Sequence, residues 1–593
     1  MQIRTDRIYR MFLRLTRRLS NRQMMMLLAV AVGALAGVGT YLFEMLLYGI
    51  RNGLTHWFPV DSAHVLLLFY PAVGIILATL FVKYVVRDNI SEGVTRVLYA
   101  MSSRNSRIAR HNCWTSVVGG ATTIGFGGSV GPEAPIVLTG AAIGSNVGRL
   151  ARLNYKNTTL LLCCGAGAAL AAIFKAPITG VVFVLEILML DITAGSVIPL
   201  LIASITATTM AFMLRGFDPI LAVTLAPADA FELWQIPLFI LLGVLCGLMA
   251  WYFTSMNSRV GGFFKSIDKQ YKKWLWGGAI LGILIFVFPP LYGEGYEGFT
   301  SLMHGNAQEL FNNSLFYRFR DIDWVIILFV IATMFFKVIA MSTTNAAGGV
   351  GGTFAPSLFV GAFTGASLAL VCNTLFGWEV SIVSFTLVGM AGVMSGVMNA
   401  PLTSIFLIAE LSNGYGLFIP LMITACISFA VDYYLDPDSI YTKQLRQKGE
   451  LLTHDKDQSV FVFLKLEELM ETDFLRIKEN MTLGDIVHII STARRNIFPV
   501  IDNFGRLIGV VQLDDLREDM FKHEKYGHPI SDYMIPPPDK IIEHEAILSV
   551  MEKFEDKHAW MLPVVDKQGR YLGFISKSRI LNAYREQLVK IQQ

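Results

Sequence analysis

The sequence predicts an all-α polytopic membrane domain followed by a smaller α/β region in the cytosol. Of the 593 residues, 53% are hydrophobic and only 16% are charged, whereas soluble domains typically carry about 25% charged residues. Apolar runs dominate from residue 24 to about residue 435, and charged residues return after about residue 443. This composition argues against a soluble enzyme, and the formal net charge of +3 gives no signal for nucleic-acid binding.

The first 22 residues form a basic segment ahead of the membrane domain. They contain no glutamate, and their arginines are Arg4, Arg7, Arg10, Arg14, Arg17, Arg18 and Arg22. Arginine-rich segments stay on the cytoplasmic side of a membrane, so we expect the N-terminus and the charged C-terminal region in the cytoplasm. The segment is either a solvated helix or an amphipathic helix lying on anionic headgroups. The short tails favour a bacterial plasma membrane.

The membrane domain is predicted over residues 23–446, and its helices are expected to be interrupted. The apolar runs lie near 24–50, 63–86, 113–147, 158–190, 195–214, 235–255, 274–290, 323–341, 353–398 and 401–435. A simple bilayer span needs about 20 apolar residues, and several runs are longer or are broken by Gly and Pro. Broken helices are tolerated at membrane depth where protein or water satisfies the freed backbone groups, so they indicate a transport site.

The membrane domain contains an internal repeat. The Gly and Pro positions of residues 127–144 recur in residues 348–365. The Ala-Pro, Thr and Glu positions of residues 176–186 recur in residues 400–410. We therefore expect two homologous halves, as in many transporters.

Each half carries a Gly-x-x-Ala-Pro element that reads as a loop entering a helix. The first turn of a helix leaves backbone N–H groups free at the positive end of its dipole, and two such starts meeting in the membrane would hold an anion. Glu133 lies in the first of these elements. Its carboxylate either complements the helix dipole or occupies the anion site as a gate, and we favour the gate because intramembrane acids are usually functional.

These elements resemble those of the CLC family of chloride channels and chloride/proton exchangers, over residues 24–446. The resemblance implies that Glu133 is the gating glutamate. The second Gly-x-x-Ala-Pro element is similar to the family's central anion-site element. Residues Ser439–Lys443 resemble the end of the family's membrane domain, which implies that Tyr441 offers its hydroxyl to the same anion. The anion-binding residues implied in this way are Ser91, Gly131, Gly352, Thr353, Phe354, Ala355 and Tyr441.

Two departures from the family pattern bear on the transported ion and on protons. The family's serine element matches residues 91–95, and the register puts either Ser91 or Glu92 in the serine position. A charged Glu92 would repel an anion, so chloride is implied by the family alone and a fluoride exporter stays open. Exchangers of this family usually carry an inner proton acid at the position of Ile187. This residue favours a channel or a weakly coupled pathway over the alternative, a strict chloride/proton antiporter.

Other ionisable residues in the membrane domain are interpreted as structural. Glu186 and Glu410 occupy equivalent repeat positions, which favours roles at helix ends. Lys337 is expected to pair with an acid or to extend its ammonium toward the interface. Glu44 is expected to be paired or to face other helices.

The C-terminal region contains a second repeat after a linker at 447–465. Residues 498–511 match residues 562–575 in a strand–turn–strand pattern. The two units, at 466–525 and 526–593, resemble a tandem pair of CBS domains, which implies homodimerisation or regulation. Adenine nucleotide binding is the less favoured option, and its contacts would be Gln512, Asp515, Ser576 and Arg579.

The sequence contains no P-loop, His-Glu-x-x-His or Gly-x-Ser-x-Gly motif, so we expect no enzyme activity. Its six cysteines lie in or beside apolar stretches without metal-ligand spacing, so neither a metal nor a required cofactor is expected. The predicted function is anion transport, chiefly of chloride, by a homodimer in the lipid bilayer. The alternatives are a strict antiporter, a fluoride exporter and a nucleotide-sensing regulator.

Overall fold

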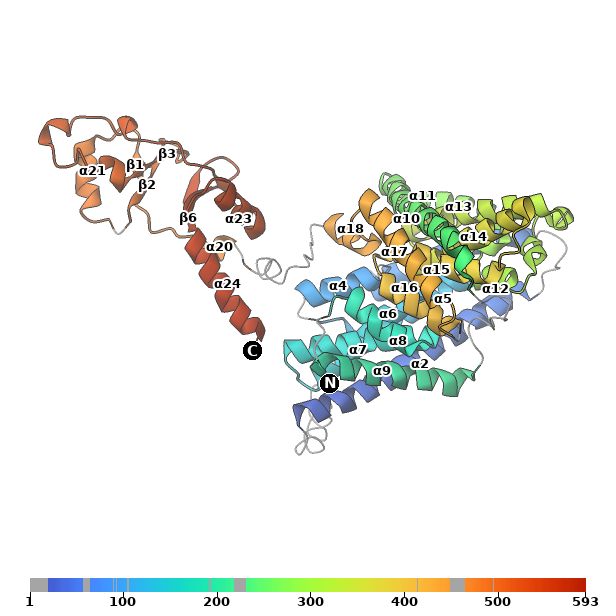
Figure 1. Cartoon of the computed structure of the whole chain (residues 1–593). Coiled ribbons are helices and arrows are strands. Elements are labelled where there is room, and N and C mark those ends of the chain that lie inside the picture. Colours follow the sequence, from blue (N-terminus) through green and yellow to red (C-terminus); the bar gives the residue numbers. More distant parts are fainter. Residues whose placement is uncertain are drawn as a thin grey trace. The chain divides into compact units, whose positions relative to one another are not determined.

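The computed structural model describes residues 20–56, 64–88, 90–91, 93–103, 106–190, 194–217, 231–412, 414–447, 464, 466–493 and 495–592. The chain divides into two compact units, Met1–Leu451 and Leu452–Gln593. Most of the predicted basic segment and linker, and Glu92, lie outside the described residues. Figure 1 shows the first unit as a stack of helices and the second as small sheets with helices.

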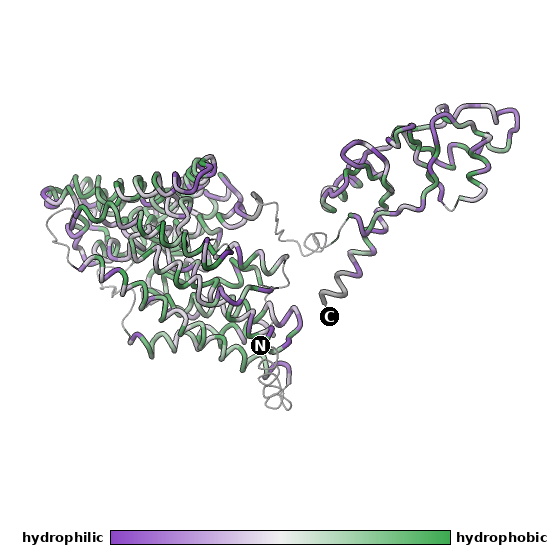
Figure 2. Tube along the Cα trace, turned by 180° about the vertical axis from the view of Figure 1, so that it is seen from behind, coloured by the Kyte–Doolittle hydropathy of each residue, from purple (hydrophilic) through white to green (hydrophobic). Residues whose placement is uncertain are grey.

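Helices make up the first unit, as predicted. They are α2 (Asn21–Thr55), α3 (Tyr70–Leu80), α4 (Gly93–Ser103), α5 (Thr115–Gly125), α6 (Glu133–Leu150), α7 (Tyr155–Phe174), α8 (Pro177–Glu186), α9 (Ala194–Arg215), α10 (Ile236–Lys265), α11 (Gln270–Val287), α12 (Tyr296–Met303), α13 (Asp323–Ala347), α14 (Phe354–Val371), α15 (Ile382–Met398), α16 (Pro401–Leu411), α17 (Phe418–Leu435) and α18 (Ile440–Gln447). Eight helical segments in the described ranges are long and apolar enough to cross a membrane. Figure 2 shows that hydrophobic residues prevail along these helices.

The long apolar runs are broken where the sequence predicted interruptions. The run at 113–147 divides into α5 and α6, and the run at 353–398 divides into α14 and α15. Between α5 and α6 the chain turns at Gly127, whose φ of +95° is a conformation that L-residues with side chains rarely adopt. These breaks place helix starts inside the first unit, where neighbouring elements bury them.

The internal repeat is visible as two matching sets of helices. In each set an 18-residue helix, α6 or α14, packs against the next helix, α7 or α15. A Cβ added at Gly144 would overlap the carbonyl of Leu161, and one added at Gly365 would overlap the carbonyl of Phe385. Glycine therefore allows the same close helix contact in both halves.

The second unit contains two similar three-stranded sheets. Its strands are β1 (Ile477–Lys478), β2 (Ile497–Ile501), β3 (Leu507–Gln512), β4 (Ile541–Ile542), β5 (Met561–Val565) and β6 (Tyr571–Ser576), in the orders β1-β2-β3 and β4-β5-β6. Its helices are α20 (Leu466–Leu469), α21 (Leu483–Ile490), α22 (Leu513–Leu516), α23 (Ile547–Asp556) and α24 (Lys577–Gln592). The two hairpin turns pair, because the N–H of Leu507 donates to the carbonyl of Gly569 at 3.0 Å.

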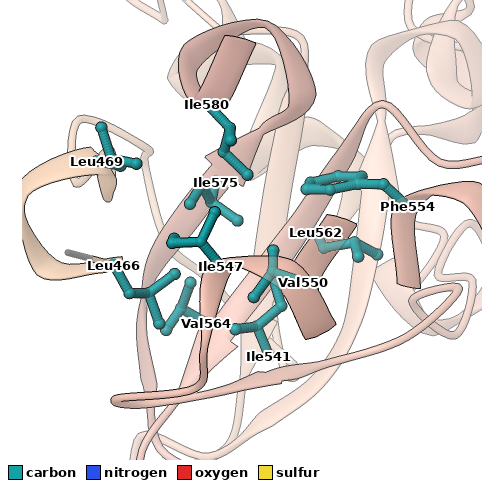
Figure 3. Packing of buried hydrophobic residues seen from close by; sticks show 10 residues of the cluster. All are labelled: Leu466, Leu469, Ile541, Ile547, Val550, Phe554, Leu562, Val564, Ile575 and Ile580. Atoms are coloured by element: carbon teal, nitrogen blue, oxygen red, sulfur yellow. The ribbon is translucent and has the colours of Figure 1, made fainter. Parts of the chain in front are cut away.

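The core of the second sheet includes a segment that precedes the first sheet. Leu466 and Leu469 precede the first sheet but lie in the hydrophobic core of the second, together with Ile541 and Ile580 (Figure 3). Ile530 follows the first sheet and lies in its core. Each of the predicted units, 466–525 and 526–593, contains one sheet, but the core of the second sheet includes Leu466 and Leu469 from the first unit, and the core of the first sheet includes Ile530 from the second.

Candidate functional site

The starts of α4, α6 and α14 converge in the first unit. Gly131 and Gly352, at matching repeat positions, form a two-way backbone bridge with N···O distances of 2.9 and 2.7 Å. A Cβ added at Gly93, the first residue of α4, would overlap the carbonyl of Ala134 in α6. Helix starts from both halves are thus joined at one place.

Glu133 fills the space at this junction. It is the first residue of α6 and is only 1% exposed. Its Oε1 accepts a hydrogen bond from the backbone N–H of Phe354, the first residue of α14, and the amide of Ala355 also faces the carboxylate. The carboxylate therefore occupies the positive end of the α14 dipole, which is the position expected for a bound anion.

Gly131 and Gly352, two of the predicted anion-binding residues, use their backbone N–H groups within the protein. Each of their N–H groups donates to the carbonyl of the other glycine, so neither is available to an anion. A Cβ added at either glycine would overlap the Glu133 carboxylate. Both glycines are therefore needed for close approach, and the donor to the carboxylate is the Phe354 amide.

A pocket with Tyr441 in its wall reaches the same junction from one side, and we call it the Tyr441 pocket. It is lined by Ser91, Gly93, Val94, Thr95, Ala134, Thr254, Asn257, Ser258, Gly261, Lys265, Ser342, Asn345, Ala346, Gly351, Gly352, Thr353, Ile440, Tyr441, Lys443 and Gln444. The charged residues among these are Lys265 and Lys443, and Lys443 pairs with Asp436. The lining therefore combines apolar side chains with hydroxyl and amide groups, one paired cation and Lys265, and these donors and cations suit an anion.

The predicted anion-site residues lie in this pocket or directly behind it. Ser91, Thr353 and Tyr441 line it, and the Thr353 side chain lies beside the Tyr441 phenol. Phe354 is fully buried, and its ring packs against Phe174 with the ring centroids 5.4 Å apart. The structure thus brings Ser91, Thr353 and Tyr441 together with Glu133.

Glu186 and Glu410 have the structural role that their repeat positions predicted. The Glu186 carboxylate accepts from the backbone N–H groups of Leu402 and Thr403, at 3.0 and 2.7 Å, at the start of α16. The Glu410 carboxylate accepts from Ile178 and Thr179, at 2.9 and 2.8 Å, at the start of α8. Each acid thus caps the helix that carries the other.

Ile187 lies at the C-terminal end of α8 and is 5% exposed. Its aliphatic side chain has no proton to exchange. The neighbouring carboxylate of Glu186 also accepts from the Thr403 hydroxyl at 2.6 Å. The acid beside Ile187 is therefore engaged by three donors of one helix start.

Lys337 lies on the other side of the junction and is completely buried. Its Nζ donates to the Ser129 hydroxyl at 2.9 Å and to the Gly293 carbonyl at 3.0 Å, and it lies 4.9 Å from the centroid of the Phe359 ring. A hydroxyl and a carbonyl therefore accept the hydrogen bonds of the ammonium inside the protein, and the acid whose charge acts on Lys337 is Glu294, so of the two expected alternatives Lys337 does not extend to the interface. Glu44 is paired as expected, with Arg215.

A second pocket beyond Lys337, which we call the Glu294 pocket, was not predicted from the sequence. It is lined by Tyr48, Arg51, Lys175, Arg215, Glu294, Tyr296, Glu297, Thr300, Ser301, His304 and Glu309. A usable signal was present in Gly293-Glu294-Gly295-Tyr296, where an acid stands between two glycines with φ values of +62° and +89°. Such glycines indicate a tight turn that presents the residue between them.

The four predicted nucleotide contacts lie at the ends of two equivalent strands. Gln512 ends β3 and Ser576 ends β6, while Asp515 and Arg579 are exposed in the following helices. The Ser576 hydroxyl already donates to Glu471 at 2.9 Å.

Glu471 also forms an ion pair with Arg495 at 2.7 Å. Hydrogen bonds to Asp473, followed by the charge of Glu471, raise the pKa of Arg495 above its ordinary value. Glu471, which is paired with Arg495, therefore already occupies the position beside the Ser576 hydroxyl.

Comparisons with known proteins agree with this geometry. The family model described as voltage gated chloride channel matches residues 73–433, and the CBS domain model matches residues 466–522 and 530–586. The "H(+)/Cl(-) exchange transporter ClcA" of Vibrio parahaemolyticus serotype O3:K6 (strain RIMD 2210633) is 28% identical over 443 residues, which cover 71% of this chain and 89% of that protein.

Two solved structures share the fold. The crystal structure of a slow cyanobacterial Cl⁻/H⁺ antiporter has a TM-score of 0.61 at 23% identity and covers 72% of this chain and 98% of its own. The crystal structure of a eukaryotic CLC transporter has a TM-score of 0.60 at 16% identity and covers 94% and 99%.

Proposed function

Because the chain belongs to the voltage-gated chloride channel family, we propose that it carries chloride across a membrane along a path gated by Glu133. The observation that carries this proposal is the position of the Glu133 carboxylate. It accepts the Phe354 N–H at the start of α14, so it competes with an anion for the same donor. Protonation would remove the negative charge and free that position for chloride.

The direction of the path follows from the predicted orientation of the chain. With the N-terminus in the cytoplasm, α2 runs outward, and its late residues Tyr48 and Arg51 line the Glu294 pocket. That pocket then opens to the outside. The Tyr441 pocket lies beside α18, which leads into the C-terminal unit, and it then opens to the cytoplasm, with Tyr441 as its inner constriction.

We assign the protein weak coupling to protons, or none. Ile187 cannot carry a proton, and Glu186 beside it is held by Leu402 and Thr403. A proton that reached Glu133 from the outside would therefore lack an evident inner acceptor at this position. Chloride could then move without an obligatory proton in the opposite direction.

The second candidate is a strict chloride/proton antiporter, and the names of the relatives favour it. The Vibrio protein is named an H⁺/Cl⁻ exchange transporter, and Glu133 serves an exchanger as well as a channel. A fluoride exporter is a further alternative because the register allows Glu92 instead of Ser91 at the serine position of the family element. Pro135 argues against it, because this proline is the residue that the family's chloride-type element carries.

The wider setting of the protein is part of the proposal. We assign a homodimer with one pathway in each subunit, in a bacterial plasma membrane, with both termini in the cytoplasm. The CBS pair would serve dimerisation or regulation. An adenine nucleotide would have to displace Glu471 from Ser576, so nucleotide sensing is the less favoured role of this unit.

Chloride efflux from proteoliposomes, with proton movement recorded at the same time, tests the proposal. Valinomycin sets the membrane voltage. Chloride efflux without proton uptake is the expected result, and Glu133→Gln should remove its dependence on external pH. Uphill proton movement in a fixed ratio to chloride would establish the antiporter instead. Absence of chloride flux together with fluoride or nitrate flux would overturn the assignment of chloride.

A further inference from the structure

The Glu294 pocket holds a dense group of ionisable side chains from several elements. The ionisable residues that line it are Tyr48, Arg51, Lys175, Arg215, Glu294, Tyr296, Glu297, His304 and Glu309. Outside the lining, Lys337 interacts electrostatically with Glu294, and Glu44 and Glu133 interact with Tyr296. Arg51 pairs with Glu297 and Arg215 pairs with Glu44. Glu294 is only 9% exposed, so its carboxylate faces this group rather than open solvent.

The turn that carries Glu294 is fixed against the gate region. The Gly293 carbonyl accepts from Lys337, and the Gly293 N–H donates to Gly127 at 3.4 Å. Lys337 also holds Ser129 at 2.9 Å, four residues before Glu133. The Lys337 ammonium therefore holds both the turn that carries Glu294 and the loop that leads into α6.

Tyr296 has a buried hydroxyl without a partner. Its oxygen is inaccessible to solvent and has no hydrogen bond among the described residues, and the same holds for Oε2 of Glu133. Buried polar atoms of this kind are usually satisfied by water. The Tyr296 phenol interacts electrostatically with both Glu294 and Glu133. It lines the Glu294 pocket, so Tyr296 belongs to that pocket and also interacts with the gate.

We propose that Glu133 exchanges its proton with the outer solution through Glu294 and Tyr296, with bridging water. A proton from the pocket water binds the Glu294 carboxylate and passes to the Tyr296 oxygen, while the proton of that phenol moves on to Oε2 of Glu133. One proton is transferred in total, and Tyr296 is neutral before and after. Tyr296 and Glu294 thereby determine how fast the gate follows external pH. This inference rests on the proposed gating role of Glu133.

A stopped-flow jump in external pH on chloride-loaded proteoliposomes tests the relay. In Tyr296→Phe and Glu294→Gln the chloride flux should follow the jump about tenfold more slowly or worse, since positioned proton-transfer groups contribute at least this much. Tyr48→Phe is the matched control for the phenol, because Tyr48 lines the same pocket but is 42% exposed. Glu297→Gln is the control for the acid, because its side chain is 78% exposed. Both controls should behave as wild type.

Repeating the measurement in the Glu133→Gln background separates proton transfer from a structural effect of the Tyr296 substitution. In Glu133→Gln the gate has no proton to receive, so adding Tyr296→Phe should leave chloride flux unchanged. An equal loss of flux in both backgrounds would overturn the relay in favour of packing. A wild-type response in Tyr296→Phe and Glu294→Gln, while Glu133→Gln loses its pH dependence, would refute the relay alone. A pH response that survives Glu133→Gln would refute the proposed gate and the relay with it.

Discussion

The reciprocal caps on α8 and α16 lead to a prediction with two matched halves. Glu186→Ala would leave the N–H groups of Leu402 and Thr403, and the Thr403 hydroxyl, without their acceptor. Loss of a helix cap, of a charge at the helix N-terminus and of one hydroxyl bond together cost about 2–3 kcal/mol. Glu410→Ala removes the equivalent bonds at the start of α8, so it should cost about the same.

The assay is thermal unfolding of the purified protein in detergent, followed by monodispersity on size-exclusion chromatography. The two single variants should lose similar amounts of stability. The double variant should lose roughly their sum, because the two caps lie at different helix starts. Glu186→Gln and Glu410→Gln keep one acceptor oxygen, so each should be milder than the alanine variant.

The same variants also test whether Glu186 moves protons. If Glu186 only caps α16, Glu186→Gln and Glu410→Gln should change transport to the same small extent. Selective loss of proton movement in Glu186→Gln, at wild-type stability, would refute the structural role and would make this acid the inner proton acceptor beside Ile187.

Three further changes have defined outcomes. Tyr441→Ala should widen the inner end of the pocket and raise chloride efflux from proteoliposomes, and a wild-type rate would exclude Tyr441 from the path. Gly365→Ala should cost about 2 kcal/mol or more by overpacking against the carbonyl of Phe385, seen as lower thermal stability, whereas an unchanged midpoint would refute the close helix contact. Hydrogen bonding from Lys525, then from Lys522 and Tyr533, lowers the pKa of Asp519 from 3.8 to about 2. Because the folded pKa is depressed, this contribution is present above about pH 4 and is lost as pH falls toward 2. Asp519→Asn should therefore flatten the acid-induced loss of stability in that range, measured by hydrogen exchange of 513–533 in the full chain, and an unaltered acid profile would contradict it.

The sequence predicted those features of the site that depend on repeated local patterns. The Gly-x-x-Ala-Pro elements correctly located the starts of α6 and α14, since Pro and Gly restrict the backbone directly. The matching positions of Glu186 and Glu410 predicted helix-end roles. That each acid caps the other's helix required the contact between α8 and α16, which no local pattern contains.

The remaining features depend on long-range contacts. The mutual hydrogen bonds of Gly131 and Gly352 were missed because an amide in a loop offers the same N–H to an anion or to a carbonyl. The Glu294 pocket was missed because its charges come from helices far apart in the chain. Likewise, Leu466 and Leu469 resemble any short apolar flank, and their place in the second CBS core depends on the paired sheets.

The Gly131–Gly352 bridge joins a residue to its own repeat counterpart, which is the contact expected beside an approximate two-fold axis. The same correspondence pairs Glu133 with Phe354, so the equivalent residues are an acid in one half and an aromatic residue in the other. The backbone of the path is thus nearly symmetric, while its chemistry is not. A fully symmetric path would treat ions from either face alike. Under the proposed gating role of Glu133, only one half supplies a removable charge, so inward and outward movement of an ion are inequivalent from the first step.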